Sequence, residues 1–312
     1  MPVFVFGSVN ADLVFAVPEL PAPGRTVLGE AYRALPGGKG ANQAVAAARD
    51  GARVAFAGAV GRDPLAAVAL SALRAAAGVD LSRVAETGAA TGCAAICVDP
   101  AGRNQIAVAA GANALARAAQ VEDAALVPGG VVLLQMEVPP AETGRLITRA
   151  RTRGARVALN LAPPGDLPDE VVRALDLLVA NEHEAAWLAA RLGCGADAGA
   201  LRAALGGGPD VAVTRGEAGA EAATAAGLLR VPAFPVAAAD TTGAGDCWCG
   251  VLASALDAGA PLEKAMLRAS AAAAIACTRP GAAAAMPEAA ETEALLGAAT
   301  MARPIGGAVD GR

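Results

Sequence analysis

Short apolar runs alternate with longer helix-like segments along most of the chain. The first run, from Val3 to Phe6, ends at a glycine, as expected of a strand buried on both faces of a mostly parallel sheet. Strands that alternate with helices imply right-handed crossovers, so the pattern predicts an α/β fold with a mostly parallel sheet. Further strands are predicted at 54–60, 131–135, 156–160, 177–180 and 210–214, with a strand-like run at 231–236, and helices through Asp50 and at 64–77, 139–153, 168–174, 247–258, 261–278 and 287–299.

Two parts of the chain depart from this rhythm. Residues 13–35 break into short strand-like pieces around three prolines and Gly24, which predicts an antiparallel flap. Residues 91–98 and 104–109 flank Asp99-Pro100-Ala101-Gly102, which is a hairpin signal. We expect these strands to join the flap in a small sheet that covers the main sheet as a lid. The exposed face of the lid is a candidate homodimer contact.

Composition and charge narrow the class of protein. The 312 residues show no internal repeat or linker, so we expect one domain over 1–312 with a mobile tail at 301–312. A net charge of −5 without a Lys/Arg-rich run argues against nucleic acid as the partner.

No apolar run reaches the roughly 18 to 20 residues of a membrane span. The N-terminus lacks the basic region of a secretory signal, so we expect a cytoplasmic protein without a membrane partner. The six cysteines lack metal-ligand spacing and are expected to be reduced and buried.

The segment from Asp240 to Asp246, Asp-Thr-Thr-Gly-Ala-Gly-Asp, carries the strongest chemical signal. Small residues at 243–245 let backbone N–H groups approach a phosphate, and the positive end of the following helix favours negative charge there. A carboxylate beside a phosphate site needs another task, such as accepting a proton from a nucleophile that attacks phosphorus. The alternative is a glycine-rich turn in which Asp246 is an ordinary first-turn acid.

A second glycine-rich segment, Gly37-Gly38-Lys39-Gly40-Ala41-Asn42-Gln43-Ala44, precedes the first helix. Lys39 and Asn42 are three residues apart and can share a helix face. The segment is not a Walker A loop, because the required glycine-to-lysine spacing is absent. Taken alone, it is also consistent with a glycine turn that carries a solvated lysine.

Polar side chains gather where the predicted strands end, at the edge of a parallel sheet where ligands bind. Asn181 and Glu184, at i and i+3 of a helix start, could face one volume beside hydrated Mg²⁺ and phosphates, or could simply cap the helix. A turn is the alternative for Asn10 and Asp12. The turn after the strand at 210–214 is fit to approach a nucleotide. The polar residues at these strand ends are Asn10, Asp12, Glu137, Asn160, Asn181 and Glu184.

Together, these motifs resemble the ribokinase (PfkB) family of carbohydrate kinases over residues 2–298. The resemblance is carried by Gly-Gly-Lys-Gly-Ala-Asn-Gln-Ala near the N-terminus and Asp-Thr-Thr-Gly-Ala-Gly-Asp near the C-terminus, in that order. Gly-Ser-Val-Asn-Ala-Asp, Leu-Leu-Gln-Met-Glu, Asn-Glu-His-Glu and Ala-Gly-Ala-Asn match as well. The resemblance implies a three-layer sandwich with a mostly parallel central sheet flanked by helices, plus a small β-sheet lid. It also implies ATP-dependent phosphorylation of the primary hydroxyl of a sugar, most similar to the family members that make ribose 5-phosphate.

The resemblance also implies roles for individual residues. Asp246 would be the general base, and the backbone N–H groups of Gly243, Ala244 and Gly245 would stabilise the transferring phosphoryl group. Glu184 would organise Mg²⁺ through water. Sugar hydroxyls would be bound by Asn10, Asp12, Gly38, Lys39, Asn42 and Glu137; ATP would be bound by Asn181, Thr214, Gly216 and Gly245; and a monovalent cation, K⁺, would be bound by Asp240, the Thr242 carbonyl and carbonyls near Cys277, Pro280 and Gly281.

Several positions depart from the family pattern. Cys247-Trp248-Cys249 follows the proposed base, and Asn160-Leu161-Ala162-Pro163 also differs from the usual pattern. Arg215 stands where an apolar residue is common, and Ala285 stands where a hydroxyl often assists the cation. The alternatives that we weigh are kinases for fructose, 2-keto-3-deoxygluconate or a nucleoside, and a non-catalytic sugar-binding regulator. A dinucleotide-dependent oxidoreductase is excluded, because no Gly-x-Gly-x-x-Gly follows the first strand.

Overall fold

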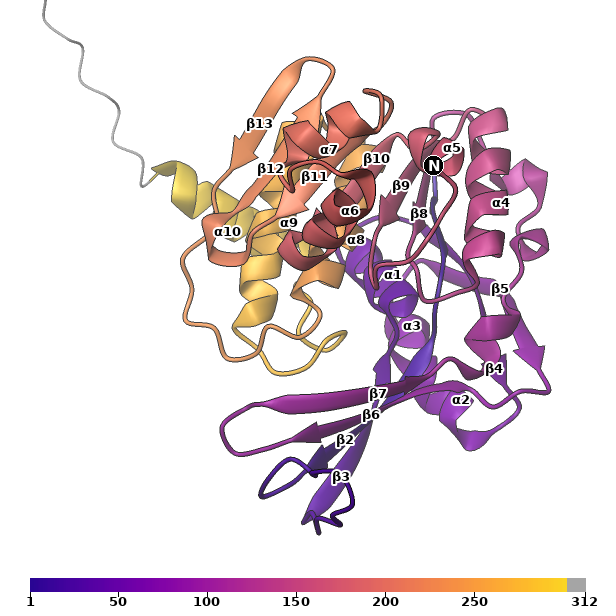
Figure 1. Ribbon diagram of the computed structural model, residues 1–312, viewed down its shortest axis with the longest axis vertical. Coiled ribbons are helices and arrows are strands. Elements are labelled where there is room, and N and C mark those ends of the chain that lie inside the picture. The colour runs from indigo at the N-terminus through magenta and orange to yellow at the C-terminus, as the bar shows by residue number, and fades with distance from the viewer. Residues whose placement is uncertain (302–312) are drawn as a thin grey trace, which may run out of the picture.

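The computed structural model describes residues 1–301 and builds them around a nine-stranded sheet flanked by helices (Figure 1). Seven neighbouring strands are parallel, and a hairpin at one edge adds two more strands through antiparallel pairing. The α/β fold predicted from the sequence is therefore confirmed. In spatial order the strands are β13 (Gly227–Val231), β12 (Ala220–Thr224), β11 (Asp210–Thr214), β10 (Leu177–Asn181), β9 (Arg156–Asn160), β8 (Val131–Leu134), β1 (Val3–Phe6), β4 (Val54–Gly61) and β5 (Val79–Thr87).

Alternate residues of the interior strand β1 enter different cores, as a sheet with helices on both faces requires. Val3 and Val5 belong to one core, and Phe4 and Phe6 belong to the other. The sheet is thus the middle of three layers. The first core is covered by α1 (Lys39–Arg49), α2 (Pro64–Ala69), α3 (Ser71–Ala75), α8 (Ala244–Asp257) and α9 (Leu262–Cys277), with α10 (Ala289–Met301) on α9; the second is covered by α4 (Pro140–Thr152), α5 (Asp169–Arg173), α6 (Glu182–Leu192) and α7 (Ala198–Ala204).

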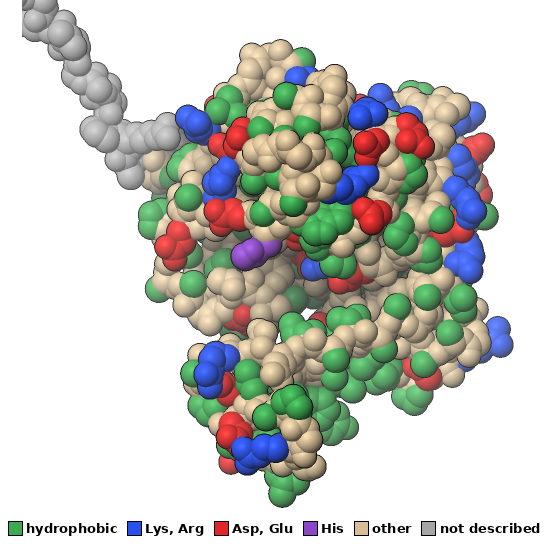
Figure 2. Space-filling view, viewed as in Figure 1, with side chains coloured by type: hydrophobic (Ala, Val, Ile, Leu, Met, Phe, Trp, Pro, Cys, Tyr) green, Lys and Arg blue, Asp and Glu red, His purple; other side chains and the backbone are tan. Residues whose placement is uncertain are grey.

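A separate four-stranded sheet, which we call the small sheet, projects from the body of the molecule (Figure 1). Its spatial order is β3 (Ala31–Gly37), β2 (Asn10–Ala16), β6 (Gly92–Val98) and β7 (Asn104–Ala109). The outer pairs are antiparallel, whereas β2 and β6 run parallel. The strands predicted within 13–35 and 91–109 lie in this sheet. Figure 2 shows hydrophobic side chains over its visible surface and a hollow between it and the body.

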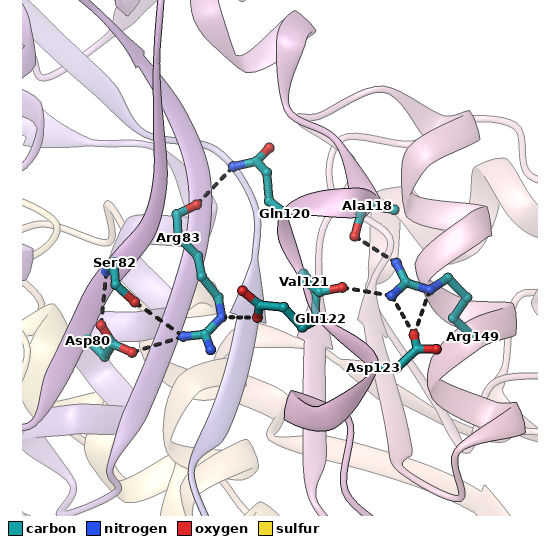
Figure 3. A network of polar contacts seen from close by, with 9 residues as sticks. All are labelled: Asp80, Ser82, Arg83, Ala118, Gln120, Val121, Glu122, Asp123 and Arg149. Atoms are coloured by element: carbon teal, nitrogen blue, oxygen red, sulfur yellow. Dashed lines mark hydrogen bonds and ion pairs between the residues drawn. The ribbon is translucent and has the colours of Figure 1, made fainter.

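The segment between the small sheet and β8 is hydrogen-bonded to β5 and to α4 (Figure 3). It holds three short 3₁₀ helices, η1 (Gly111–Leu115), η2 (Ala118–Gln120) and η3 (Asp123–Ala125). Arg83 of β5 binds Glu122 at 2.7 Å, and Gln120 donates to the Arg83 carbonyl at 2.8 Å. From α4, Arg149 donates to the Ala118 carbonyl at 2.8 Å. These bonds fix a segment that also carries Asn113 to the candidate site.

Several sequence predictions need correction. The strand-like run predicted at 231–236 is wrong, because β13 ends at Val231 and two prolines follow, which lack the N–H that a ladder needs. The helix predicted at 64–77 divides into α2 and α3 at Leu70. The edge strand β5 and the helix α7 were not predicted.

Two further predictions concern the chain end and the cysteines. The mobile tail predicted at 301–312 lies outside the described residues, apart from Met301, which ends α10. The six cysteines are free, but only Cys247 and Cys249 are buried. Within residues 1–301, no helix is long and apolar enough to cross a membrane.

Candidate active site

The carboxyl ends of neighbouring parallel strands bring the predicted site residues to one edge of the main sheet. Ser8 follows β1, Glu137 follows β8, and Asn160 ends β9. On the next two strands, Asn181 of β10 pairs in register with Thr214 of β11. Side chains from distant parts of the sequence therefore share one edge, as the topology of open α/β sheets predicts for a ligand site.

Asp246 lies in the first turn of α8 and is 8 % exposed. Its Oδ2 accepts a hydrogen bond from Asn42 Nδ2 at 2.9 Å, and its Oδ1 accepts one from Gln43 Nε2 at 3.0 Å. Burial raises the pKa of the Asp246 carboxyl, although the charge of Lys39 and these two donors oppose the shift. The arrangement suits a base, because the carboxylate is desolvated, oriented and more basic than usual.

Asn42 leaves one polar atom unsatisfied beside this carboxylate. Its Nδ2 donates to Asp246, but its Oδ1 is buried and has no partner among the described residues. A buried carbonyl oxygen without a donor is costly in a folded protein. This oxygen is an acceptor that a substrate hydroxyl group could satisfy, which makes Asn42 and Asp246 candidate contacts for an alcohol.

Glu137 holds the start of α1 against the end of β1. Its Oε2 accepts from Ser8 Oγ at 2.6 Å and from the Lys39 backbone N–H at 3.0 Å. Ser8 Oγ in turn accepts from the Gly40 N–H at 3.3 Å. Glycine is required at position 40, because a Cβ there would lie 2.6 Å from the Ser8 nitrogen. Glu137 therefore has a positioning contact as well as the sugar contact predicted for it.

A single lysine faces several carboxylates in this region. Burial acts to lower the pKa of Lys39, but the charges of Asp246, Glu137 and Glu184 outweigh it and raise the pKa. Burial, followed by the charges of Glu137 and Asp246, raises the pKa of Asp12 from 3.8 to about 6. The site thus concentrates negative charge around one ammonium group, which favours ligands that donate hydrogen bonds.

Asn10 begins β2 and is held by Asn113, which the sequence prediction did not assign to the site. Asn113 Nδ2 donates to Asn10 Oδ1 at 2.7 Å, and Asn113 Oδ1 accepts from the Val9 N–H at 2.9 Å. Asn10 lies between Gly37 and Gly92 in the small sheet. Cβ atoms at these glycines would lie 2.1 Å from Asp12 Oδ2 and 2.3 Å from Asn10 Oδ1, respectively. The glycines make room for the two polar side chains.

The predicted phosphate loop is exposed at Gly245, and at Gly243 it has a backbone conformation that favours glycine. Gly243 has φ of 75°, and a Cβ there would lie 2.8 Å from the Ala282 side chain. Gly245 is exposed, with open space where its Cβ would point. The Ala244 N–H donates to the Thr241 carbonyl at 3.2 Å, so it is less available than predicted. The N–H groups of Gly243 and Gly245 have no such partner within residues 1–301.

Asn181 and Glu184 form a reciprocal cap on α6, which is the structural alternative considered from the sequence. Asn181 Oδ1 accepts from the Glu184 N–H at 2.9 Å, and Glu184 Oε2 accepts from the Asn181 N–H at 2.8 Å. Burial raises the pKa of Glu184. Because both Glu184 oxygens already bind Asn181, the carboxylate fits a hydrated Mg²⁺ through water better than by direct coordination.

The residues predicted to bind a monovalent cation meet where two loops cross. Asp240 Oδ1 accepts from the Thr242 N–H at 2.9 Å, and Asp240 Oδ2 accepts from the Gly281 N–H at 2.8 Å. Burial acts to raise the pKa of Asp240, but these bonds lower it overall. The Cys277 carbonyl lies beside the same loop and accepts from the Asp240 N–H at 3.1 Å. An ionised carboxylate beside backbone carbonyls is a donor set that fits a hard cation.

The unusual residues after the base do not disturb the loop. Trp248 is 4 % exposed, and its Nε1 donates to Ser270 Oγ of α9 at 3.2 Å. Burial raises the pKa of the Cys247 and Cys249 thiols, so both remain neutral packing residues. Arg215 binds Glu221 at 2.7 Å on β12 and leaves the Gly216 turn exposed. Ala285 is buried and offers no hydroxyl.

A large groove lies elsewhere on the surface. It has a volume of about 940 Å³ and runs along α4, where Arg145 and Arg149 are already paired with Glu142 and Asp123. None of the predicted site residues lines it. The chemistry at the sheet edge, rather than the size of a cavity, therefore identifies the candidate active site.

Comparison with known proteins agrees with this assignment. Residues 2–289 match the model of the pfkB family carbohydrate kinases. A ribokinase of Haemophilus influenzae is 35% identical over 295 residues, which cover 92% of this chain and 96% of the relative. The structure of a ribokinase from Thermotoga maritima is similar with a TM-score of 0.86 and 31% identity, covering 95% of this chain and 99% of that one.

A second solved structure was determined with ligands. The Arabidopsis thaliana ribokinase complexed with ribose and ATP is similar with a TM-score of 0.84 and 29% identity, covering 95% of this chain and 98% of that one. The family model spans both glycine-rich segments and the strand ends between them, and it includes Asp246. The chain therefore belongs to the pfkB family of carbohydrate kinases and is a sugar kinase.

Proposed function

We propose that this protein transfers the γ-phosphoryl group of ATP to the primary hydroxyl of D-ribose and forms D-ribose 5-phosphate. The observation that carries the proposal is the buried Asp246 carboxylate, bound by Asn42, beside the unsatisfied Asn42 Oδ1. An alcohol that donates one hydrogen bond to Asn42 would lie within reach of the base. Similarity to ribokinases from several organisms supports ribose as the acceptor.

Phosphoryl transfer begins with the sugar in the space between the small sheet and the main sheet. Asn10, Asp12, Gly38, Lys39, Asn42 and Glu137 bind its hydroxyls. Asp246 accepts the proton of the primary hydroxyl as that oxygen attacks the γ-phosphorus in line. The N–H groups of Gly243 and Gly245, with a smaller contribution from Ala244, stabilise the charge that moves onto the phosphoryl group.

The nucleotide lies over the neighbouring strand ends. Asn181, Thr214 and Gly216 line its site, and Gly245 approaches the phosphates. Mg²⁺ bound through water near Glu184 would neutralise phosphate charge. Asp240, the Thr242 carbonyl and carbonyls near Cys277, Pro280 and Gly281 would hold K⁺ and so fix the geometry of the phosphate loop. The absence of a hydroxyl at Ala285 would weaken the response to K⁺.

The small sheet acts as a lid within a single kinase domain, and it pairs with a second copy. Its support is an exposed apolar surface on β7, where Ile106 at 56% and Val108 at 58% exposure lie on the same face of the strand. Such a surface is unusual for a monomer and favours association. Equilibrium sedimentation would test the homodimer, with Val108→Glu as the variant that dissociates it.

A coupled assay with ATP and a panel of acceptors tests the proposed reaction. The panel contains D-ribose, fructose, 2-keto-3-deoxygluconate and nucleosides, each at matched concentrations. We expect D-ribose to have the highest kcat/KM. Rapid turnover of another acceptor without turnover of ribose would overturn the substrate assignment. Sugar binding without phosphorylation of any acceptor would instead indicate a regulator.

A further inference from the structure

Gln43 is a second hydrogen-bond donor to Asp246, and it binds the carboxylate oxygen that Asn42 does not bind. Its side chain is completely buried on α1. Gln43 Nε2 donates both to Asp246 Oδ1 at 3.0 Å and to Asn160 Oδ1 at 3.1 Å. Gln43 Oε1 accepts from Gln135 Nε2 at 2.6 Å. Every polar atom of the Gln43 side chain is therefore engaged, and none remains for a substrate.

The negative charge of Asp246 determines which groups donate and which accept in this hydrogen-bond network. An ionised carboxylate can only accept hydrogen bonds, so Gln43 must present its NH₂ group to Asp246. The Gln43 carbonyl oxygen then faces Gln135, which must donate in turn. Reversing either amide would place two acceptor oxygens against each other in a buried site, which is costly. The orientation of both glutamines therefore follows from one negative charge.

The same network reaches the ends of three neighbouring strands. Asn160 ends β9, Gln135 follows β8, and Gly7 follows β1. A Cβ at Gly7 would lie 1.9 Å from Gln135 Oε1, so glycine is needed to admit the glutamine. Through Gln43, the carboxylate at the start of α8 is thus held relative to the rigid centre of the sheet.

We propose that Gln43 is a positioning residue for Asp246: it holds Oδ1 so that Oδ2, beside Asn42, faces the sugar hydroxyl. This inference rests on the proposed function, because it assumes that Asp246 accepts the hydroxyl proton. Gln43 acts through Asp246 and does not touch the substrate. Losing one of two donors leaves the carboxylate free to rotate and less stabilised as an anion.

The test must account for the other groups around Asp246. Gln43→Met removes the donor and acceptor while keeping an unbranched side chain of similar length. Asp246 keeps its bond from Asn42 in this variant. The titratable groups that act on Asp246 or sense its charge all remain in place: Lys39 of α1, Glu137 after β8, Asp12 of β2, Glu184 of α6, and Cys247 and Cys249 of α8.

We expect Gln43→Met to lower kcat about 10- to 100-fold, since a hydrogen bond to a charged group is lost. The acid limb of the kcat/KM profile moves to higher pH, because the Asp246 anion loses a donor, while KM for ATP changes less than about threefold. In an Asp246→Asn background the same substitution has little further effect on kcat. A purely structural role would lower stability without moving the acid limb.

Gln120→Met is the matched control. Gln120 also spans two elements, because its Nε2 donates to the Gly58 carbonyl at 2.7 Å and to the Arg83 carbonyl at 2.8 Å, but it has no bond to Asp246. We expect it to lower thermal stability and leave the acid limb in place. If Gln43→Met does not fold, Gln135→Met provides a second variant with a smaller shift in the same direction.

Failure of the positioning role can be separated from failure of the proposed function. Carboxyl ¹³C NMR, assigned with Asp246→Asn, follows the titration of Asp246 without requiring turnover. A higher Asp246 pKa in Gln43→Met than in the wild type supports the role whether or not any sugar is phosphorylated. An unchanged Asp246 pKa together with an unchanged acid limb overturns it. Absence of turnover in the wild type, by contrast, overturns the proposed function alone.

Discussion

The sugar half and the nucleotide half of the candidate site are stabilised in different ways. In the sugar half, hydrogen bonds join side chains to partners 98 to 204 residues away in the sequence. In the nucleotide half, the side-chain bonds of Asn181 and Glu184 and the Asp240–Thr242 bond span two or three residues, although Asp240 also accepts from the Gly281 N–H, 41 residues away. The first half depends on the packing of the whole fold, whereas the second is built mainly from local turns and helix starts.

Exposure follows the same division. Asn10, Asn42 and Asp246 are buried, and the glycines at 37 and 92, beside Asp12 and Asn10, leave no space for a Cβ. Gly216 and Gly245 are exposed, and a Cβ at either position would meet open space. A preformed, crowded sugar half favours discrimination among acceptors by shape and hydrogen bonding. An open nucleotide half binds phosphates mainly through backbone groups and charge.

The largest expected effect is removal of the base that both halves share. Asp246→Asn should lower kcat by roughly 10² to 10⁴, because the hydroxyl loses its proton acceptor, while ATP affinity stays nearly unchanged. Steady-state kinetics with varied ATP and ribose would measure both. Near-native turnover in this variant would contradict the assignment of Asp246 as the base.

The second-largest effect is expected when a methyl group is added to the crowded sugar half. A Cβ at position 92 would lie 2.2 Å from Asn113 Nδ2 and 2.3 Å from Asn10 Oδ1. Gly92→Ala should therefore displace Asn10 and lower kcat/KM for ribose about 10- to 100-fold, corresponding to about 1–3 kcal/mol of overpacking. KM for ATP should remain within about threefold. An equal loss of kcat/KM for ribose and for ATP would show that the sugar half and the nucleotide half are not independent.

A glycine-to-alanine substitution in the nucleotide half should instead affect ATP more than ribose. Gly245→Ala meets no atom within 4 Å and lies in the first turn of α8. We expect the free energy of unfolding to stay within about 1 kcal/mol of the wild type, because alanine is favourable in helices. KM for ATP should rise several-fold, since the new methyl group narrows the approach to the phosphate. Chemical denaturation and ATP titration separate the two results.

The smallest expected effect is a pH dependence of the free energy of unfolding and of KM for ribose, which arises from Asp12 in the sugar half. The pKa of Asp12 is raised from 3.8 to about 6, mainly by burial, so the folded protein binds more protons than the unfolded chain between these values. The free energy of unfolding therefore falls as pH rises from about 4 to about 6. Over the same range Asp12 ionises, and KM for ribose should fall as its ability to accept hydrogen bonds increases.

Asp12→Asn removes this titration and serves as the test. Its stability profile should be flatter between pH 4 and about 6 than that of the wild type, as measured by thermal unfolding at each pH. The KM for ATP should not acquire a new pH dependence. A stability slope that survives the substitution would assign the effect to another buried group of the site.

Much of the nucleotide half follows from the sequence alone, because most of its contacts are local. The glycines at 243 and 245 and the acid at 246 mark a helix start that can receive a phosphate. The spacing of Asn181 and Glu184 is that of a capping box, and the structure forms that cap. The alternation of strands and helices likewise determines the α/β fold and brings the strand ends to one edge.

The sugar half could be anticipated only in part, because its contacts join segments far apart in the chain. Lys39 and Asn42 were identified from a glycine-rich motif, but that motif does not reveal that Gln43 binds Asp246 or that Asn113 binds Asn10. Such pairs depend on how α1, α8 and the small sheet pack together. The sequence determined which chemical groups were present, whereas the tertiary structure decided which of them hold the base in place, since hydrogen bonds between distant segments form only when the whole sheet is assembled.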